Sequence, residues 1–490
     1  MQLFPDHAKP WQRPSEFFLL LFAAALPHSI AAAQIAAGGV TVFRIGELVA
    51  TKRWPRRTRL DFPILCYGVI SVLAAVFSLA PAVSVSKLRG TALVLLVLIV
   101  ADAIRTRRQV LLLVAVLLGS ASLAAMGTWW QKVVGDGVAI VSLLADSPLQ
   151  QAGVNAGDII LACNRQRLRQ PDQFARVLRD AAGKQALRCQ ALVDGQIPYE
   201  FTLPADRLKA SVPSAHTATT GRYARARGSY SHYVTYAEVL LLLTTLAVGL
   251  WFVYPRKWRW PGGLLAVVPI LLAGALAATL TRGSWAGLVV GVLAMLWVRL
   301  GWRGRVVVLL AAVLALGGVN LLLQQWRGIG FYNPADPGDQ YRLLMWADGV
   351  RLIGDYPWLG IGMDAVKVRW RELGIRAYVQ FPLHSHFHST PIQLGVERGL
   401  FGLAAWLWLM GVYLVLLVRL LRRYRDDDWA VYGLILGIFG GVCGFLLSGV
   451  VHYNLGDSEV AMVLWFLAGV TLALKRIGEE GSVDTPARAR

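Results

Sequence analysis

The sequence predicts an all-α polytopic membrane protein of about 12 transmembrane helices that carries one small α+β insert. Apolar residues make up 56% of the 490 positions, more than a soluble fold can hide from water. They gather in repeated runs of about 18 residues, the length that a helix needs to cross a bilayer. Basic residues fall mainly in the short connections between those runs.

The apolar runs recur along most of the chain. Residues 17–50 hold either one long tilted helix or two short helices broken near Pro27, and the favoured pair brings the expected total to about twelve. The remaining runs are 61–81, 90–104, 109–127, 234–254, 262–281, 284–298, 306–323, 399–418, 429–451 and 458–474.

The formal net charge of +20 is explained by topology. Every second connection is strongly basic, as the positive-inside rule predicts for cytoplasmic loops, so the charge does not indicate a nucleic-acid partner. Membrane lipids are the partner that this pattern implies. The basic groups are Lys52 to Arg59, Arg105 to Arg108, Arg256 to Arg259, Arg299 to Arg305 and Arg419 to Arg425.

Alternation assigns the other connections to the exported side. These are 128–232, the turn at Arg282, 324–396 and 452–457. The connection 82–89 is also expected outside, although Lys87 and Arg89 depart from the charge rule there.

Residues 133–205 differ in character from the rest of the chain. Strands are expected at 138–141, 157–164, 187–193 and 199–203, the last two forming a hairpin around Asp194-Gly195. Ser147 begins a short helix that Gly153 ends, and a second helix over 172–181 places Phe174, Val177 and Leu178 on one face. Residues 206–232 have the Ser/Thr/Ala/Arg-rich composition of a linker.

The motif SPxxxAGxxxGDII, at 147–160, closely resembles that of a bacterial PDZ domain, over about seventy residues. A PDZ fold captures an extended peptide at a sheet edge and holds its carboxylate in a backbone nest. The segment before Val138 is short for such a nest. A peptide or protein partner of this insert and a purely structural cap are therefore equal alternatives.

The chain has 4 cysteines, too few for a disulfide scaffold. Cys66 and Cys443 fall in membrane segments and are expected to be packing residues. Cys163 and Cys189 fall in the exported insert, where an oxidising compartment would permit a bond. We interpret them as two buried thiols in neighbouring strands, with a disulfide as the alternative.

The second exported region, 324–396, is too long for a simple connection and is rich in Trp and Tyr. Arg342, Trp346, Val350 and Ile353 recur at helical spacing, and the segment 357–362 stops that helix. We expect an amphipathic helix lying on the outer membrane surface.

Three exported groups carry chemistry. They are the tight turn Thr281-Arg282-Gly283-Ser284, the helix segment with Arg342 and Trp346, and the run from His384 to Ser389. Arginine grips phosphate oxygens in a bidentate way and stabilises a diphosphate leaving group. A neutral histidine can take a proton from a sugar hydroxyl. No acidic cluster suited to a divalent metal accompanies these groups, so no metal and no cofactor are expected.

His388-Ser389 is followed by nine residues and then by Gly399 and Gly402. This pattern resembles the H[NSQ]-x9-G-x-x-[GTY] motif of the O-antigen ligase family, and the turn at Arg282 and the segment around Arg342 look like the family's preceding motifs. The similarity covers roughly 230–475, and the earlier helices more loosely. It implies an all-helical membrane domain with its active site facing the periplasm from the bacterial inner membrane.

The resemblance also implies a reaction. A glycan would pass from undecaprenyl diphosphate to an acceptor, lipid A–core sugar above all, with inversion and without metal. His388 would be the base, and Arg282 and Arg342 would hold the diphosphate. The further candidates for substrate binding are Trp346, His384, His386, Gly399 and Gly402.

Each residue also has a structural interpretation. Arg282 is alternatively a charge at a helix end whose side chain reaches the interface, and Arg342 one arm of a surface ion pair. In an extended chain His384, His386 and His388 face one way, which also suits a metal site.

The same donor serves glycan polymerases and protein O-oligosaccharyltransferases, which are the alternatives within the superfamily. A site-2-type membrane protease would need HExxH in a helix, and the chain has none. A polysaccharide transporter or flippase is the non-enzyme alternative, disfavoured by helices nearly free of charge away from their ends.

These observations divide the chain into six parts. The N-terminal transmembrane helices occupy 1–130, the PDZ-like insert 131–205, the linker 206–232, helices around Arg282 233–323, the large exported loop 324–396, and the C-terminal helices and cytoplasmic tail 397–490.

Overall fold

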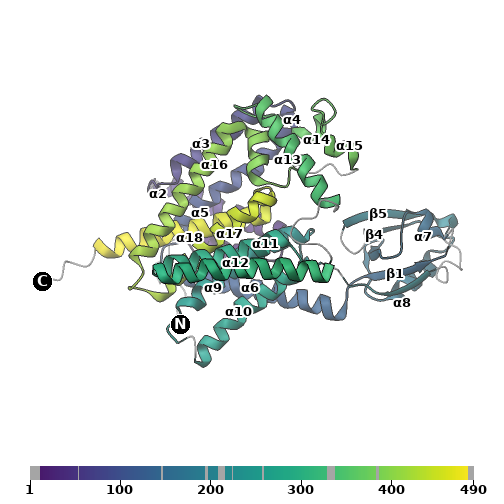
Figure 1. Cartoon of the computed structure of the whole chain (residues 1–490), viewed down its shortest axis with the longest axis horizontal. Helices are drawn as coiled ribbons and strands as arrows, with labels where there is room; N and C mark the ends of the chain where they lie inside the picture. The colour runs from purple at the N-terminus through teal and green to yellow at the C-terminus, as the bar shows by residue number, and fades with distance from the viewer. Residues whose placement is uncertain are drawn as a thin grey trace. The chain divides into compact units, whose positions relative to one another are not determined.

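The computed structural model describes residues 12–52, 55–144, 147–193, 197–207, 216–222, 225–256, 259–327, 337–381 and 386–483. It contains two compact units (Figure 1). The helical unit comprises residues 1–122, 234–276 and 281–490, and the sheet unit comprises 123–233 with 277–280.

Helices account for nearly all of the helical unit's secondary structure, as the sequence predicts. The first half of the chain forms α1 (Gln12–Ala25), α2 (Ile30–Thr51), α3 (Asp61–Val76), α4 (Pro81–Ala92), η1 (Leu93–Leu95), α5 (Leu96–Ala103) and α6 (Arg107–Val134). The second half forms α9 (Tyr233–Val253), α10 (Trp260–Ala278), α11 (Arg282–Arg299), α12 (Trp302–Arg327), α13 (Pro337–Asp355), α14 (Ala365–Arg369), α15 (Arg376–Gln380), α16 (Thr390–Arg423), α17 (Trp429–Val451), η4 (Asn454–Gly456) and α18 (Ser458–Val483).

Seven helices in the described part of the chain are long and apolar enough to cross a membrane. The multi-pass membrane fold is therefore confirmed, whereas the expected number of about twelve crossings is not. These spans are Ile30–Thr51, Pro81–Ala103, Arg107–Val134, Tyr233–Val253, Thr390–Arg423, Trp429–Val451 and Ser458–Glu480, and Asp61–Val76 and Gly262–Ala278 are shorter apolar helices.

The span that was expected at 90–104 begins earlier, at Pro81. Lys87 and Arg89 consequently lie within helix α4 and not in a connection. Pro81 is at the first helical position, where its missing N–H costs nothing. The two cations that depart from the charge rule are therefore held on a helix.

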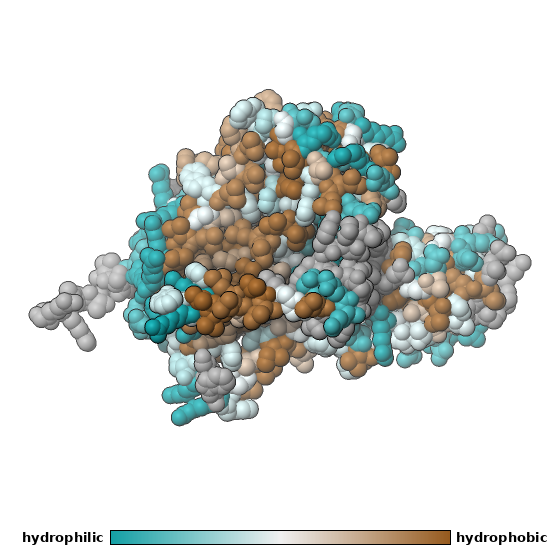
Figure 2. All heavy atoms as spheres, in the orientation of Figure 1, coloured by the Kyte–Doolittle hydropathy of each residue, from teal (hydrophilic) through white to brown (hydrophobic). Residues whose placement is uncertain are grey.

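The helical unit exposes large apolar side chains in the way that lipid contact requires. On α12, Val313 and Leu314 are 69% and 75% exposed. Hydrophobic residues cover much of the face of this unit that Figure 2 shows. In water such a surface would be a strong aggregation site, and in a bilayer it is matched to its solvent.

Helices α11 and α17 approach closely because glycines face each other between them. A Cβ on Gly444 would lie 2.5 Å from the carbonyl oxygen of Gly287, and one on Gly291 would lie 2.5 Å from that of Gly440. Small residues let membrane helices pack backbone to backbone, which strengthens dispersion contacts where no hydrophobic effect drives association.

Gly444→Val should therefore destabilise the fold by about 1–3 kcal/mol, the usual cost of overpacking, because the clash is with backbone. Gly411→Val in α16 is the matched control, since nothing lies within 4 Å of a Cβ there. Thermal unfolding of the detergent-solubilised variants measures the difference. Equal midpoints for the two variants would show that the α11–α17 contact tolerates a side chain.

The sheet unit contains the strands and the amphipathic helix that the PDZ-like sequence predicts. Its sheet has the order β5-β4-β2-β1-β6, with β3 paired to β2. The elements are β1 (Val138–Leu143), α7 (Pro148–Gln151), β2 (Ile159–Cys163), β3 (Gln166–Arg167), α8 (Pro171–Ala181), β4 (Leu187–Val193), β5 (Ile197–Leu203), η2 (Ala205–Arg207) and β6 (His216–Thr220).

Helix α8 covers this core as expected. Phe174 and Leu178 are fully buried, and Val177 packs against the same cluster. The β4–β5 hairpin also forms, although its expected tip at Asp194-Gly195 lies outside the described residues. The expected linker is corrected in part, because residues 216–220 within it form β6 and pair with β1.

The interpretation of Cys163 and Cys189 as free thiols is wrong. They lie directly opposite each other in the antiparallel β2–β4 pair and form a disulfide bond. Facing positions on neighbouring strands bring two Cβ atoms close enough for this bond, which the sequence pattern alone did not reveal. Disulfides persist in oxidising compartments, so the bond is consistent with an exported insert.

Helix α13 forms where the sequence predicts a helix. Tyr341, Met345 and Leu352 are buried, Ile353 packs against the same cluster, and Val350 is 62% exposed. The position of this helix on the membrane surface stays a prediction.

Candidate functional site

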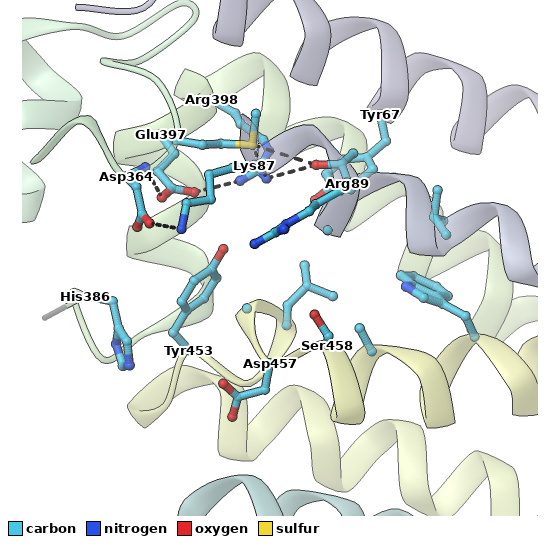
Figure 3. Close-up of a pocket in the computed structure, with 18 of the residues that line it drawn as sticks. Tyr67, Lys87, Arg89, Asp364, His386, Glu397, Arg398, Tyr453, Asp457 and Ser458 are labelled. Carbon is cyan, nitrogen blue, oxygen red and sulfur yellow. Dashed lines mark hydrogen bonds and ion pairs between the residues drawn. The ribbon is translucent and has the colours of Figure 1, made fainter. Parts of the chain in front are cut away.

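A cavity of about 350 Å³ opens within the helical unit. Its lining comes from α3, from α4 and η1, from the segment that leads into α14, from His386 and the first turns of α16, and from the α17–α18 loop with the start of α18 (Figure 3). Most of its polar lining is charged or phenolic. These residues are Tyr67, Lys87, Arg89, Asp364, Lys367, His386, Glu397, Arg398, Tyr453, Asp457 and Ser458.

Asp364 joins two of the cavity's lysines. Its carboxylate lies 2.7 Å from Nζ of Lys87 and 3.1 Å from Nζ of Lys367. Burial alone would raise the pKa of Asp364, but the two ammonium groups hold it below its usual range. One carboxylate thus orients two cations on one wall of the cavity.

Arg398 and Glu397 form a second, deeper ion pair. Their side chains are only 5% and 4% exposed, and an Arg398 nitrogen lies 2.9 Å from a Glu397 oxygen. Glu397 also accepts hydrogen bonds from the Gln393 side chain, at 2.8 Å, and from the backbone N–H of Asp364, at 2.9 Å. Such a pair is strongly held because loss of either partner would leave a buried charge.

Arg89 differs from these paired cations. Its side chain extends into the cavity, as Figure 3 shows. Within the part of the chain that the structure describes, its guanidinium makes no ion pair or hydrogen bond. Five N–H donors of a planar fork are therefore directed into a space that is large enough for an anionic group.

A break in α16 shapes this wall. Gly399 has φ +65°, and a Cβ there would lie 2.1 Å from the carbonyl oxygen of Trp358. Residues beside the break bond to the preceding loop through Ile361 N–H to Val396 O, at 2.8 Å, and Leu400 N–H to Pro357 O, at 2.6 Å. The motif glycine thus has a packing role that sets the direction of the adjacent charged pair.

Gly402 packs directly beneath that pair. A Cβ at this position would lie 2.2 Å from Cβ of Arg398. The second motif glycine therefore leaves room for the Arg398 side chain rather than contacting the cavity.

The loop between α17 and α18 supplies the opposite wall. Asp457 accepts a hydrogen bond from the Thr235 hydroxyl at 2.7 Å. Burial of its carboxyl, with smaller contributions from Glu459 and Glu238, raises the pKa of Asp457 to about 7. Burial likewise raises the pKa of the Tyr453 phenol, so that this group remains protonated.

Binding of an anion in this cavity should strengthen as the pH falls from 8 to 6. Asp457 gains a proton through this range, whereas a disubstituted diphosphate, the anion that the motif resemblance implies, keeps its negative charge. Removing one repulsion in a partly desolvated site is worth about 1 kcal/mol, or roughly fivefold in affinity. Equilibrium binding of a lipid diphosphate at several pH values measures this, and Asp457→Asn should abolish the dependence. An unchanged pH profile in that variant would assign it to the histidines instead.

One of the predicted histidines, His386, lies at the edge of the cavity. His386 lines it, with its ring centroid 5.5 Å from that of Tyr453. The His388 ring is 4.3 Å from the His386 ring, and the His388 backbone N–H donates to Nδ1 of His386 at 3.1 Å. His384 lies outside the described residues.

His388 itself is held in a left-handed conformation, with φ +49°. Its ring packs edge-on against Tyr341 of α13, with centroids 5.6 Å apart. Two residues later, the Thr390 N–H donates to the His452 carbonyl at 3.0 Å. The motif is thus attached to the same loop that carries Tyr453 and Asp457.

The turn that carries Arg282 packs against the segment that joins α17 to α18. Arg282 is the first residue of α11, and a Cβ on the next residue, Gly283, would lie 2.8 Å from Nε2 of His452. The Ser284 hydroxyl donates to buried Glu238 at 2.8 Å. The Arg282 side chain is not among the residues that line the cavity.

Arg342 and Trp346 do not line the cavity either. A guanidinium nitrogen of Arg342 lies 3.3 Å from a carboxylate oxygen of Asp339, and the Arg342 side chain is 37% exposed. This contact is the surface ion pair that was the alternative interpretation of Arg342. In the described structure the indole N–H of Trp346 is buried without a hydrogen-bond partner. The residue of α13 that contacts the histidines is instead Tyr341, whose ring packs against that of His388.

Sequence reasoning missed most of the cavity's charged residues. A signal existed for Lys87 and Arg89, which stand out against the positive-inside rule. Glu397 and Arg398 were also visible as two charges at the start of an apolar run. Asp457 gave no comparable signal, because its carboxyl acquires its properties only through burial and contact with Thr235.

Comparison with known families yields two matches. Residues 267–407 match the O-antigen ligase family, and residues 140–188 match the PDZ domain. No curated protein matches the chain. The resemblance to an O-antigen ligase with a PDZ-like insert is confirmed. The ligase match includes Arg282, Arg342 and His388, whereas Lys87, Arg89 and Asp457 lie outside it.

Proposed function

We propose that this protein is a membrane glycosyltransferase that moves a glycan from undecaprenyl diphosphate to an acceptor sugar of lipid A–core, on the periplasmic face of the inner membrane. The match to O-antigen ligases supports glycan transfer of the ligase or polymerase type. The observation that carries the finer proposal is the cation-rich cavity with His386 at its edge and His388 against it.

The charges of the cavity favour a diphosphate. Its lining has four cations, Lys87, Arg89, Lys367 and Arg398, against the three carboxylates of Asp364, Glu397 and Asp457. With Asp457 titrating near pH 7, the excess is at least one positive charge. Hydrogen-bond donors that are already in position around the diphosphate stabilise the negative charge that develops on it as it leaves. The site then does not have to reorganise during the reaction.

In this proposal Arg89 contacts the diphosphate, and Arg282 and Arg342 assist from the motif segments. The pair of Arg342 with Asp339 is partly exposed and therefore weak, so a phosphate can replace the carboxylate. His388 takes the proton from the acceptor hydroxyl. Nδ1 of His386 accepts a hydrogen bond from the His388 backbone, which assigns the ring proton of a neutral His386 to Nε2.

The proton and charge balance needs no metal in this scheme. The acceptor oxygen attacks the anomeric carbon, its proton passes to His388, and the bond to the diphosphate oxygen breaks. Cationic side chains receive the charge that leaves with undecaprenyl diphosphate. The reaction is proposed to invert the anomeric centre, because a single displacement does so.

Purified full-length protein with a lipid-linked glycan in EDTA tests the proposal. Lipid A–core, a non-reducing glycan end and a pilin-type protein are offered separately as acceptors, and products are resolved by mass spectrometry. Glycosylation of lipid A–core is the expected result. Transfer only to glycan or only to protein would make the chain a polymerase or a protein oligosaccharyltransferase. Movement of the donor across liposomes without any transfer would make it a flippase.

A further inference from the structure

A second cavity of the helical unit, the α3–α16 cavity, lies between the entry to α3 and the second half of α16, two helices that pack side by side (Figure 1). Its volume is about 540 Å³. None of its lining residues belongs to the cavity described above, and the proposed glycan transfer does not use it. Within the described residues the lining consists of Arg59, Trp408, Gly411, Val412, Val415, Leu416 and Arg419.

Two arginines give the α3–α16 cavity its charge. The lining that the structure describes includes no carboxylate to balance them. Within the described part of the chain, neither Arg59 nor Arg419 makes an ion pair or a hydrogen bond, and both residues are exposed. Two planar guanidinium groups are therefore available to oxygen anions, and a phosphate is the ligand that complements them.

The rest of the lining is apolar and follows the axis of α16. From Trp408 to Arg419 this helix rises about 16 Å, which is close to the hydrocarbon depth of one bilayer leaflet. Leu416 is buried, whereas Trp408 and Val415 are 44% and 49% exposed. Trp408 packs edge-on against Phe62 of α3, with ring centroids 5.5 Å apart. The cavity thus continues from its cations along an apolar wall.

Gly411 keeps this wall open. It is exposed in the interior of α16, and nothing lies within 4 Å of a Cβ built there. A glycine inside a helix lowers its stability, and elsewhere in this unit, at Gly287 and Gly444, the missing side chain admits a neighbouring helix. No described helix fills the space over Gly411, so this space is open to a molecule from outside the chain.

We infer that the α3–α16 cavity binds one anionic phospholipid, with its phosphate between Arg59 and Arg419 and an acyl chain along α16 over Gly411. A soluble anion would use the two cations and leave the apolar wall bare. A zwitterionic lipid would use the wall but offer the cations no net negative charge. An anionic phospholipid complements both, and both arginines belong to basic groups that the charge pattern assigns to the cytoplasmic leaflet.

Lipid titration of the delipidated full-length protein in detergent tests this inference. The probes are phosphatidylglycerol and phosphatidylcholine with the same acyl chains, and bound lipids are counted by native mass spectrometry. One phosphatidylglycerol should bind roughly 25-fold more tightly than phosphatidylcholine, since each arginine near the membrane surface contributes about fivefold toward an anionic lipid. Arg59→Gln combined with Arg419→Gln should remove this preference.

Two further variants separate a site from general surface charge. Arg57→Gln combined with Arg422→Gln removes the same charge from the same two basic groups but outside the cavity lining, so it should keep the preference. Gly411→Leu should weaken phosphatidylglycerol binding without changing the unfolding midpoint, because its side chain fills the wall.

Three results would overturn the inference. The first is equal binding of the two lipids by the wild type. The second is an equal loss of preference in the Arg57 and Arg422 variant, which would make the effect one of overall charge. The third is displacement of the lipid by inorganic phosphate at equal concentration, together with unchanged binding by Gly411→Leu, which would assign the two arginines to a soluble anion.

Discussion

Replacement of His388 by alanine is expected to lower the rate of glycan transfer by about a hundred- to ten-thousandfold, while the donor remains bound. The imidazole is the proposed proton acceptor, and its removal leaves the cations of the cavity in place. Transfer rate and donor affinity should be measured separately on folded, membrane-inserted protein. A loss of both together would indicate a structural role for His388 instead.

The backbone at His388 requires a second variant. With φ +49°, this residue occupies a conformation that alanine adopts less readily than asparagine. His388→Asn keeps the local conformation and removes the base, so it should match His388→Ala in rate. His384→Ala should be milder, since that residue lies outside the motif spacing. Near-normal transfer by His388→Asn, with loss of transfer in His386→Ala, would reassign the base to His386.

Arg89→Ala is expected to weaken donor binding by about ten- to a hundredfold. A charge-assisted hydrogen bond contributes roughly 1.5–3 kcal/mol, and the structure shows no competing partner for this guanidinium among the described residues. Arg89→Lys should recover part of the affinity, because it keeps the charge and loses the bidentate fork. Arg256→Ala, an exposed arginine in the turn after α9, is the matched control.

The motif arginines should respond differently. Arg282→Lys and Arg342→Lys are expected to lower both rate and donor affinity, because in the proposed function each planar guanidinium assists in holding the diphosphate. If Arg89→Ala bound the donor as the wild type does while these two variants lost it, the diphosphate would belong beside α11 and α13 rather than in the cavity.

The sequence predicted the membrane fold and the inserted domain, since each depends on local pattern, and the role of the histidines stays a prediction. Apolar runs are local, and so are the PDZ-like motif and the spacing from His388 to Gly399. The cavity depends on contacts between distant segments, such as Lys87 with Asp364, and no local pattern reports these. The same reason explains the failure at Cys163 and Cys189, whose bond follows from strand register.

The roles of the glycines also required the structure. Gly399 was a candidate for substrate binding because it belongs to a motif, and its positive φ and close approach to Trp358 give it a packing role. Lys87 and Arg89 were the strongest sequence signal for the cavity, because both depart from the positive-inside rule. A departure from the positive-inside rule has an energetic cost, and a binding site is one reason to retain it.

The proposed function requires that the cavity holds the diphosphate of the donor lipid. Structure determination of the full-length His388→Asn variant with undecaprenyl-diphosphate-linked glycan tests it most directly, because this variant should bind the donor without consuming it. We expect density for the diphosphate within hydrogen-bonding distance of the Arg89 guanidinium, with the anomeric carbon facing His386. A diphosphate bound between Arg282 and Arg342, with the cavity beside Arg89 empty, would contradict it.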